Sequence, residues 1–269
     1  MKKAQNEIDA KLKIVDCVIE LLDARIPFSS RNETLYKMSE NKERLIVLTK
    51  KDLADPLISL DWVKYYQSLG FKAVLADLND PKDIKQIVLL ASKCGDKKHE
   101  KEIKRGLKPS PVRAMIIGIP NVGKSTLINK VANRKAASVQ NKPGHTKAQQ
   151  WIKVNKDFEL LDTPGILQSS FEDKNKAINL ALCGSINQDI LPTTFLANTL
   201  LDFLSINYPS YLLKRYDLEV INKNTFFKEL AKKRGFLLKD GLDESKAEIA
   251  LLNEFKNGIL GQCSLEKIN

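Results

Sequence analysis

Gly118-Ile119-Pro120-Asn121-Val122-Gly123-Lys124-Ser125-Thr126 is the stretch that decides the fold, because it matches the phosphate-loop pattern G-x-x-x-x-G-K-[ST]. An apolar run, 113–118, precedes it, and a segment with apolar residues at helical spacing, 126–134, follows it. In such a strand–loop–helix unit, backbone N–H groups and the helix N-terminus surround phosphate oxygens. Lys124 then reaches the β- and γ-phosphates, and the Ser125 hydroxyl is placed to bind Mg²⁺. The stretch predicts a nucleotide-binding α/β domain.

Length and composition indicate a globular protein. The chain has 269 residues, of which 43% are hydrophobic and 29% charged, enough for one α/β domain and a smaller one. No apolar run is long enough to cross a bilayer, and no apolar segment follows the basic N-terminus. We therefore expect a cytoplasmic protein with no membrane partner. The four cysteines are scattered, which argues against a zinc site or disulfides: Cys17, Cys94, Cys183 and Cys263.

The positive charge is unevenly distributed. The formal net charge is +11, yet residues 171–269 contain 13 basic and 13 acidic side chains, so the whole excess lies in residues 1–170. The segment 93–108 alone has seven basic residues and three acids. Such a segment can face RNA phosphates, or it can be a solvated helix or linker, and composition leaves both interpretations open.

The hydrophobic pattern divides the chain into two parts. Alternating strand and helix signals continue to about residue 165, and apolar residues three and four apart predict only helices beyond it. We expect a G domain at 1–170, with a mostly parallel sheet and flanking helices, and a small all-α domain at 171–269. The expected strands are 13–23, 44–49, 73–77, 113–118, 151–154 and 158–162; the expected helices are 57–69, 82–94, 126–134, 191–206, 225–234 and 243–257.

Further motifs favour guanine nucleotides. Asp162-Thr163-Pro164-Gly165 fits a carboxylate that holds Mg²⁺ through water, with the Gly165 N–H near the γ-phosphate. Thr146 lies in a loop that could close over the same Mg²⁺. Thr49-Lys50-Lys51-Asp52 follows a buried strand, so Asp52 could accept both N–H groups of the guanine edge while the Lys50 stem covers the ring. Adenine lacks the 2-amino group and would leave that carboxylate unpaired.

The order of these motifs is unusual. The sequence resembles the translation-factor-related GTPases, in which the phosphate loop comes first and the guanine-reading motif last. Here the guanine-reading motif, 49–52, comes first. We therefore expect a circularly permuted GTPase domain, with the original termini joined through 93–113. The permutation cuts the usual domain order just after Gly165, so the segment with Thr146 and Gly165 runs directly into the C-terminal domain. We therefore expect γ-phosphate contacts at Thr146 and Gly165 to reorient that domain.

Longer stretches resemble one family, the bacterial ribosome biogenesis GTPase A family. The resemblance covers essentially the whole chain and rests on the stretches 23–32, 117–126, 147–151, 160–167 and 255–258. It implies a permuted GTPase with a helical C-terminal domain that acts in late maturation of the large ribosomal subunit. It also implies a monomer that binds the subunit with GTP and leaves after hydrolysis.

The resemblance assigns roles by position. Asn121, Val122, Gly123, Lys124, Ser125 and Thr126 would bind phosphates, Thr49 to Asp52 would read guanine, and Gly165 would sense the γ-phosphate. Mg²⁺ would be held by Ser125, Thr146 and Asp162, and K⁺ by Asn121. Lys124, Thr146 and Gly165 are the expected transition-state and switch contacts. The partners would be GTP, GDP and the rRNA of the large subunit, through 93–108 and through Lys214, Arg215, Lys228, Lys232, Lys233 and Arg234.

The chain departs from the family pattern at four places. Thr49 replaces an Asn, and Asp77-Leu78 replace a small polar residue that supports guanine O6. Ile166 stands where Ras-like enzymes have a water-orienting Gln. Family members also begin with a segment resembling Trp-Phe-Pro-Gly-His, whose His assists hydrolysis; it would precede Met1, and His145 is not expected to replace it. The alternative is therefore a GTP-dependent RNA-binding module with little hydrolysis. A GTPase with another client, or an ATP-using protein, is less favoured.

Overall fold

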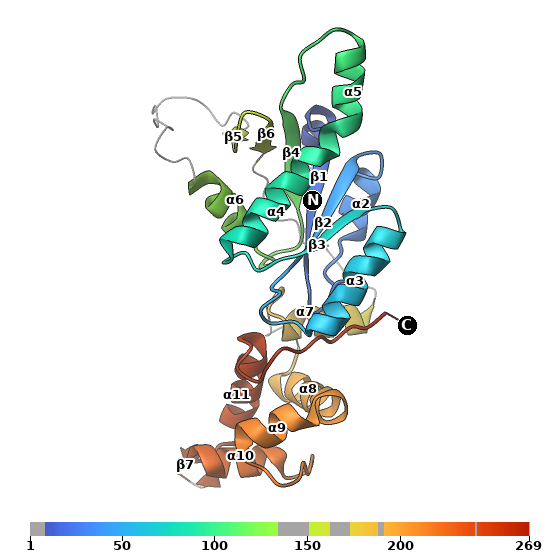
Figure 1. Ribbon diagram of the computed structural model, residues 1–269. Coiled ribbons are helices and arrows are strands. Elements are labelled where there is room, and N and C mark those ends of the chain that lie inside the picture. Colours follow the sequence, from blue (N-terminus) through green and yellow to red (C-terminus); the bar gives the residue numbers. More distant parts are fainter. Residues whose placement is uncertain (1–8, 134–150, 162–172, 188–190, 240, 269) are drawn as a thin grey trace.

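The computed structural model describes residues 9–133, 151–161, 173–187, 191–239 and 241–268 (Figure 1). Its centre is a six-stranded sheet in the order β3-β2-β1-β4-β6-β5. The strands are β1 (Cys17–Asp23), β2 (Glu43–Thr49), β3 (Lys72–Leu75), β4 (Val112–Ile117), β5 (Trp151–Lys153) and β6 (Phe158–Leu161). Every neighbouring pair is parallel except β5 with β6. The expected mostly parallel sheet is confirmed.

Helices cover both faces of this sheet, which explains why its central strands are mostly apolar. On one face, Ile19 and Val47 belong to the buried cluster that includes Ile87 of α4 (Pro81–Ser92) and Leu127 of α6 (Lys124–Asn133). On the other face, Leu22 packs with Trp62 and Tyr66 of α3 (Pro56–Ser68), and Val18 with Leu35 of α2 (Glu33–Met38). The arrangement is a three-layer α/β domain.

Two helices begin where their capping residues predict. Asp55 and Asp80 lie just before α3 and α4, and each side chain accepts hydrogen bonds from the first turn. Pro56 and Pro81 follow as the first helical residues, where a missing N–H costs nothing. The sequence placed both helices within two residues of these bounds.

The permuted connection is visible in the strand order. From the edge strand β3 the chain passes through α4, a 3-10 turn (Lys93–Gly95) and α5 (Asp96–Lys104), and then enters β4 beside β1. The segment 93–113 thus joins the two halves of the sheet, and most of its basic run forms a helix. Figure 1 shows α5 at one end of the molecule, away from the C-terminal helices.

The C-terminal part consists of helices and one small hairpin. The elements are α7 (Lys174–Leu182), α8 (Thr193–Asn207), α9 (Pro209–Tyr216), α10 (Phe226–Arg234), β7 (Leu237–Leu238), β8 (Gly241–Leu242) and α11 (Glu244–Lys256). Leu196, Leu200 and Leu204 are buried residues of α8. They belong to the same hydrophobic cluster as Leu251 and Phe255 of α11. The expectation of helices alone was wrong in detail, because β7 and β8 form a two-stranded sheet.

The division at residues 170 and 171 falls in 162–172, outside the described residues, so it stays a prediction. Within the described ranges, no helix is both long and apolar enough to span a membrane.

Candidate guanine-nucleotide site

The phosphate loop connects β4 to α6 at the carboxyl end of the sheet. Gly118 and Gly123 have φ angles of 151° and 102°, which other residues rarely adopt. A Cβ at Gly118 would lie 2.7 Å from the Leu21 carbonyl oxygen, and one at Gly123 would lie 2.5 Å from Leu78 Cδ1. Both glycines of the motif are therefore required by their surroundings, and the second lets the loop pack against residue 78.

Lys124 is folded back into this loop. Its side chain is 8% exposed, and Nζ donates a hydrogen bond of 2.5 Å to the carbonyl oxygen of Ile119. Burial lowers the pKa of the Lys124 ammonium to about 8, because the charged form loses its hydration. A bound phosphate would supply the missing counter-charge. Ser125 and Thr126, in the first turn of α6, are exposed, as a hydroxyl that reaches a hydrated Mg²⁺ should be.

The guanine-reading loop is tied to the phosphate loop by Thr49. Its hydroxyl is buried and lies 2.8 Å from the Val122 carbonyl oxygen and 3.0 Å from that of Leu22. A hydroxyl has one proton to donate, so it serves one of these acceptors at a time. The residue that departs from the family pattern thus still connects the two loops.

Lys50 adopts the left-handed conformation (φ 59°), and its Nζ forms an ion pair of 2.8 Å with Asp23 Oδ2. Asp23 is fully buried, and its carboxylate also accepts two hydrogen bonds from the Arg25 guanidinium, at 3.0 and 2.8 Å, and one from the Arg25 backbone N–H, at 3.1 Å. Burial alone would raise the pKa of the Asp23 carboxyl, but the charges of Arg25 and Lys50 outweigh it and hold that pKa well below its usual range. The lysine expected to cover the guanine ring is therefore fixed by a buried carboxylate.

The other residues predicted to contact guanine lie at the ends of β2 and β3. Asp52 is exposed, and the Lys51 N–H donates to the Ala76 carbonyl oxygen at 3.3 Å. The Asp77 N–H donates to Asp83 Oδ2 at 2.8 Å, while the Leu78 side chain is buried against Gly123. Residues 49–52, 77–78 and 118–126 are thus brought together at one end of the sheet.

Asn121 connects the phosphate loop to the C-terminal helices. It has a φ of 61° and is exposed, and its Nδ2 donates a hydrogen bond of 2.9 Å to the carbonyl oxygen of Gly184, just after α7. Because the amide nitrogen is used, the amide oxygen is left for a cation.

Three predicted residues, Thr146, Asp162 and Gly165, lie outside the described residues. Of the expected Mg²⁺ ligands the structure places only Ser125. Among the described residues, no group of three or more His, Cys, Asp and Glu side chains could hold a metal.

Sequence reasoning assigned no role to Asp23 and Arg25. Both lie in a stretch that carried the family resemblance, and a charged pair at the end of the mostly apolar strand β1 was the available signal. Their partners, Lys50, Cys183 and Lys256, are too far away in sequence for a motif to connect them.

Comparison with known proteins agrees with this geometry. A family model described as 50S ribosome-binding GTPase matches residues 113–205. The Ribosome biogenesis GTPase A of Bacillus cereus is 40% identical and covers 99% of this chain and 91% of its own. The Mitochondrial ribosome-associated GTPase 1 of Mus musculus is 33% identical, covering 99% of this chain and 88% of its own. The crystal structure of GNP-bound YlqF from T. maritima matches with a TM-score of 0.67, 26% identity and 98% of both chains.

Sheet order, motif order and the convergence of the loops define the class: a circularly permuted phosphate-loop GTPase. With a relative 40% identical over nearly its whole length, the chain belongs to the ribosome biogenesis GTPase A family.

Proposed function

We propose that this protein binds GTP and GDP at the loops described above, hydrolyses GTP, and acts in late maturation of the large ribosomal subunit. It binds the subunit with GTP and leaves after hydrolysis. The names of the relatives support this role, since the bacterial ones are ribosome biogenesis GTPases and the mouse one is a mitochondrial ribosome-associated GTPase. Those names also favour hydrolysis over a non-catalytic RNA-binding module.

One observation carries the nucleotide assignment: Thr49 joins the guanine-reading loop to the phosphate loop through the Val122 carbonyl oxygen. A nucleotide spans base to phosphate, so its two ends need loops held at a fixed separation. The contact of Leu78 with Gly123 adds the loop after β3 to the same unit. Three loops from different strands thus act as one pre-organised site.

The guanine contacts follow from the side chains present. The exposed Asp52 carboxylate accepts the two N–H groups of the guanine edge, and the Lys50 stem covers the ring with its ammonium held by Asp23. The N–H groups of Asp77 and Asn79 are already used, by Asp83 and by the Asp77 side chain. We therefore propose that the backbone N–H of Leu78 supports guanine O6.

Phosphate binding and hydrolysis rely on the phosphate loop and its cations. Lys124 pairs with the phosphates, and the Ser125 hydroxyl holds Mg²⁺ together with Thr146 and Asp162. Mg²⁺ would neutralise charge on the phosphate oxygens as the bond to the leaving group breaks. A K⁺ on the amide oxygen of Asn121 would add positive charge beside them. Thr146 and Gly165 complete the site when the γ-phosphate is present.

The organisation of the whole protein remains part of the proposal: a G domain at 1–170 and a helical domain at 171–269 in a cytoplasmic monomer. Of the basic side chains proposed for rRNA contact, Arg215 and Arg234 are paired with Glu254, and Lys233 with Asp217. Their charge is already compensated. Lys214, Lys228 and Lys232 are the better candidates in the helical domain.

Turnover assays test the proposal. GTP hydrolysis should be slow for the protein alone and should rise on addition of large ribosomal subunits, more in K⁺ than in Na⁺ buffer. Small subunits serve as the control, and an excess of ATP should not compete with GTP. Equal GTP turnover with large and small subunits would contradict the claim that the large subunit is the partner. Competition by ATP would contradict the claim that the site is specific for guanine.

A further inference from the structure

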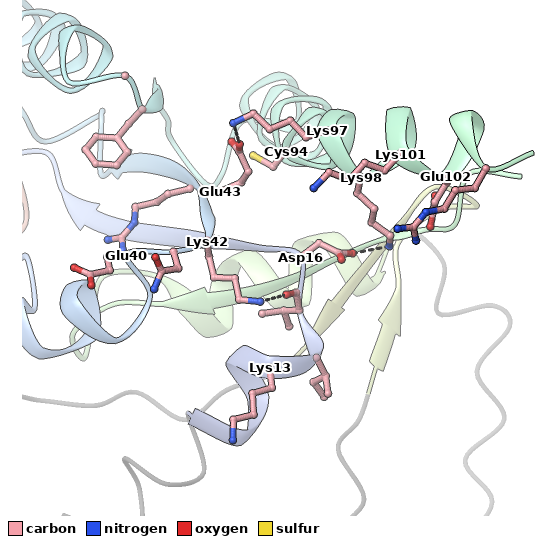
Figure 2. Close-up of a pocket in the computed structure, with 17 residues that line it drawn as sticks. Lys13, Asp16, Glu40, Lys42, Glu43, Cys94, Lys97, Lys98, Lys101 and Glu102 are labelled. Carbon is pink, nitrogen blue, oxygen red and sulfur yellow. Dashed lines mark hydrogen bonds and ion pairs between the residues drawn. The ribbon is translucent and has the colours of Figure 1, made fainter. Parts of the chain in front are cut away.

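An open groove of about 890 Å³ lies at the amino ends of the strands, opposite the nucleotide site. Its lining comes from the segment before β1, the turn before β2, the turn before β3 and α5. Figure 2 shows the lysines of α5 on one side of this groove and Lys13 and Lys42 on the other. Seven basic and four acidic side chains line it. Nothing in the proposed GTPase chemistry uses this end of the sheet.

The acidic side chains of the groove are mostly occupied by structural partners. Glu43 is paired with Lys97 at 2.6 Å, and Asp16 with Lys98 at 2.9 Å. Glu102 accepts hydrogen bonds from the N–H and hydroxyl of Ser110, at 2.9 and 2.6 Å. These contacts fasten α5 to the ends of β1, β2 and β4, and they fix the shape of the groove.

The remaining cations are not neutralised in this way. Lys13, Lys101 and Arg105 form no ion pair with any other residue that the structure describes. Lys42 donates to the Val15 carbonyl oxygen at 2.8 Å, which fixes its position but leaves its charge. Lys101 and Arg105 are exposed at the end of α5. Four cations without an ion pair among the described residues, from three segments of the chain, therefore surround the groove, where Glu40 and Glu102 are the two carboxylates that likewise form no ion pair there.

We propose that this groove binds the phosphate backbone of RNA. The cations are spread around an open channel rather than converging on one point, which suits the regular charges of a polynucleotide better than a single small anion. Long Lys and Arg side chains can follow such a backbone without reading its sequence. The inference rests on the proposed function, because a ribosomal subunit supplies the RNA.

The test compares variants with the same change in charge. K101Q/R105Q removes two groove cations, and K64Q/K85Q removes two exposed lysines from α3 and α4 as the matched control. Binding of a fluorescent RNA hairpin is measured by anisotropy over a series of salt concentrations. The groove variant should bind roughly tenfold or more weakly at 0.1 M salt, with a salt slope reduced by about 1 for each lost phosphate contact. K101R/R105K should bind like the wild type.

The groove assignment is overturned if the groove variant and the control variant have the same affinity and salt slope. It is also overturned if polyglutamate displaces the RNA at equal charge concentration. GDP affinity, measured on the same samples, separates this result from the proposed function. Normal GDP binding and co-sedimentation with large subunits, together with unchanged RNA binding in K101Q/R105Q, would reject the groove alone.

Discussion

Arg25 is a residue on which several buried contacts converge. Its guanidinium donates two hydrogen bonds to the Asp23 carboxylate, and it also donates to the carbonyl oxygens of Lys256 and Cys183, at 3.2 and 3.3 Å. Both Arg25 and Asp23 have almost no exposed surface. One side chain therefore supports the guanine-reading lysine and binds two segments of the helical part.

Removal of the Arg25 side chain should be strongly destabilising, because the buried Asp23 carboxylate keeps Lys50 and the backbone N–H of residue 25 but loses the guanidinium. We expect Arg25→Met to lower the free energy of unfolding by about 3–5 kcal/mol in urea titrations, the range for breaking a buried pair. Arg113→Met is the matched control, since Arg113 pairs with Glu159 at the surface and should cost only about 0–1 kcal/mol. Equal costs would contradict this account. Should Arg25→Met fail to fold, Arg25→Lys should give an intermediate cost.

Lys124 gives a prediction about pH. Its pKa is lowered to about 8 in the unliganded loop, whereas a bound phosphate favours the charged ammonium and raises that pKa. Binding above pH 8 therefore requires uptake of a proton, so GDP affinity should fall as pH rises, by up to about tenfold per pH unit. Lys124→Arg is the control, because arginine stays charged. If GDP affinity falls equally with pH in the wild type and in Lys124→Arg, Lys124 is ruled out as the titrating group.

At the scale of elements, the site depends on how the ends of neighbouring strands are tied together. β1 and β2 are paired along their whole length, so Asp23 lies beside Thr49. Thr49 then reaches across to the phosphate loop. The loops after β1, β2 and β4 thus share one hydrogen-bonded network. A change in one of these loops should therefore alter the affinity for the nucleotide.

Thr49→Val tests this connection, because valine has a similar shape and no hydroxyl. The substitution leaves the Val122 carbonyl oxygen without its donor, which costs about 1–3 kcal/mol of free energy in the ordered site. We therefore expect GDP to bind about tenfold more weakly in a fluorescence titration. Thr49→Ser keeps the hydroxyl and should bind like the wild type. If valine and serine variants bind GDP equally, the hydrogen bond does not organise the site.

The sequence was sufficient for elements with a strong local signal. The strands of the sheet and the helices α3, α4 and α6 were predicted within a few residues, because parallel strands buried on both faces are mostly apolar and these helices have apolar residues at helical spacing. α2, α7 and α9 were missed, since six to nine residues give only a short periodic pattern. The groove at the amino ends of the strands could not be predicted from the sequence, because it depends on which lysines of 93–108 form ion pairs with carboxylates that are distant in sequence.

At the scale of the whole molecule, the chain end fastens the helical part to the nucleotide loops. The Gln262 amide donates to the carbonyl oxygens of Lys51 and Asp52, each at 3.3 Å, and the Cys263 N–H donates to that of Leu53 at 3.0 Å. Glu266 accepts hydrogen bonds from the N–H groups of Phe28 and Ser29 and from Asn179. With Asn121 bound to Gly184, the phosphate loop and the guanine-reading loop both contact the C-terminal part directly.

This arrangement gives the helical part a route to sense the nucleotide. A γ-phosphate that draws Thr146 and Gly165 inward would alter loops that already contact Gly184 and Gln262. We expect small-angle scattering profiles of the GDP form and the GTP-analogue form to differ, with a smaller difference in Gln262→Ala. Superimposable profiles would exclude a reorientation of the C-terminal helices.

Co-sedimentation tests the central claim most directly. The protein is mixed in K⁺ buffer with separated large or small ribosomal subunits and either GDP or a non-hydrolysable GTP analogue. We expect it to sediment with the large subunit in the analogue form and much less with GDP, because in our proposal the bound nucleotide controls the ribosomal contact. Equal sedimentation with both subunits, or none with either nucleotide, would contradict the claim that this GTPase acts on the large subunit.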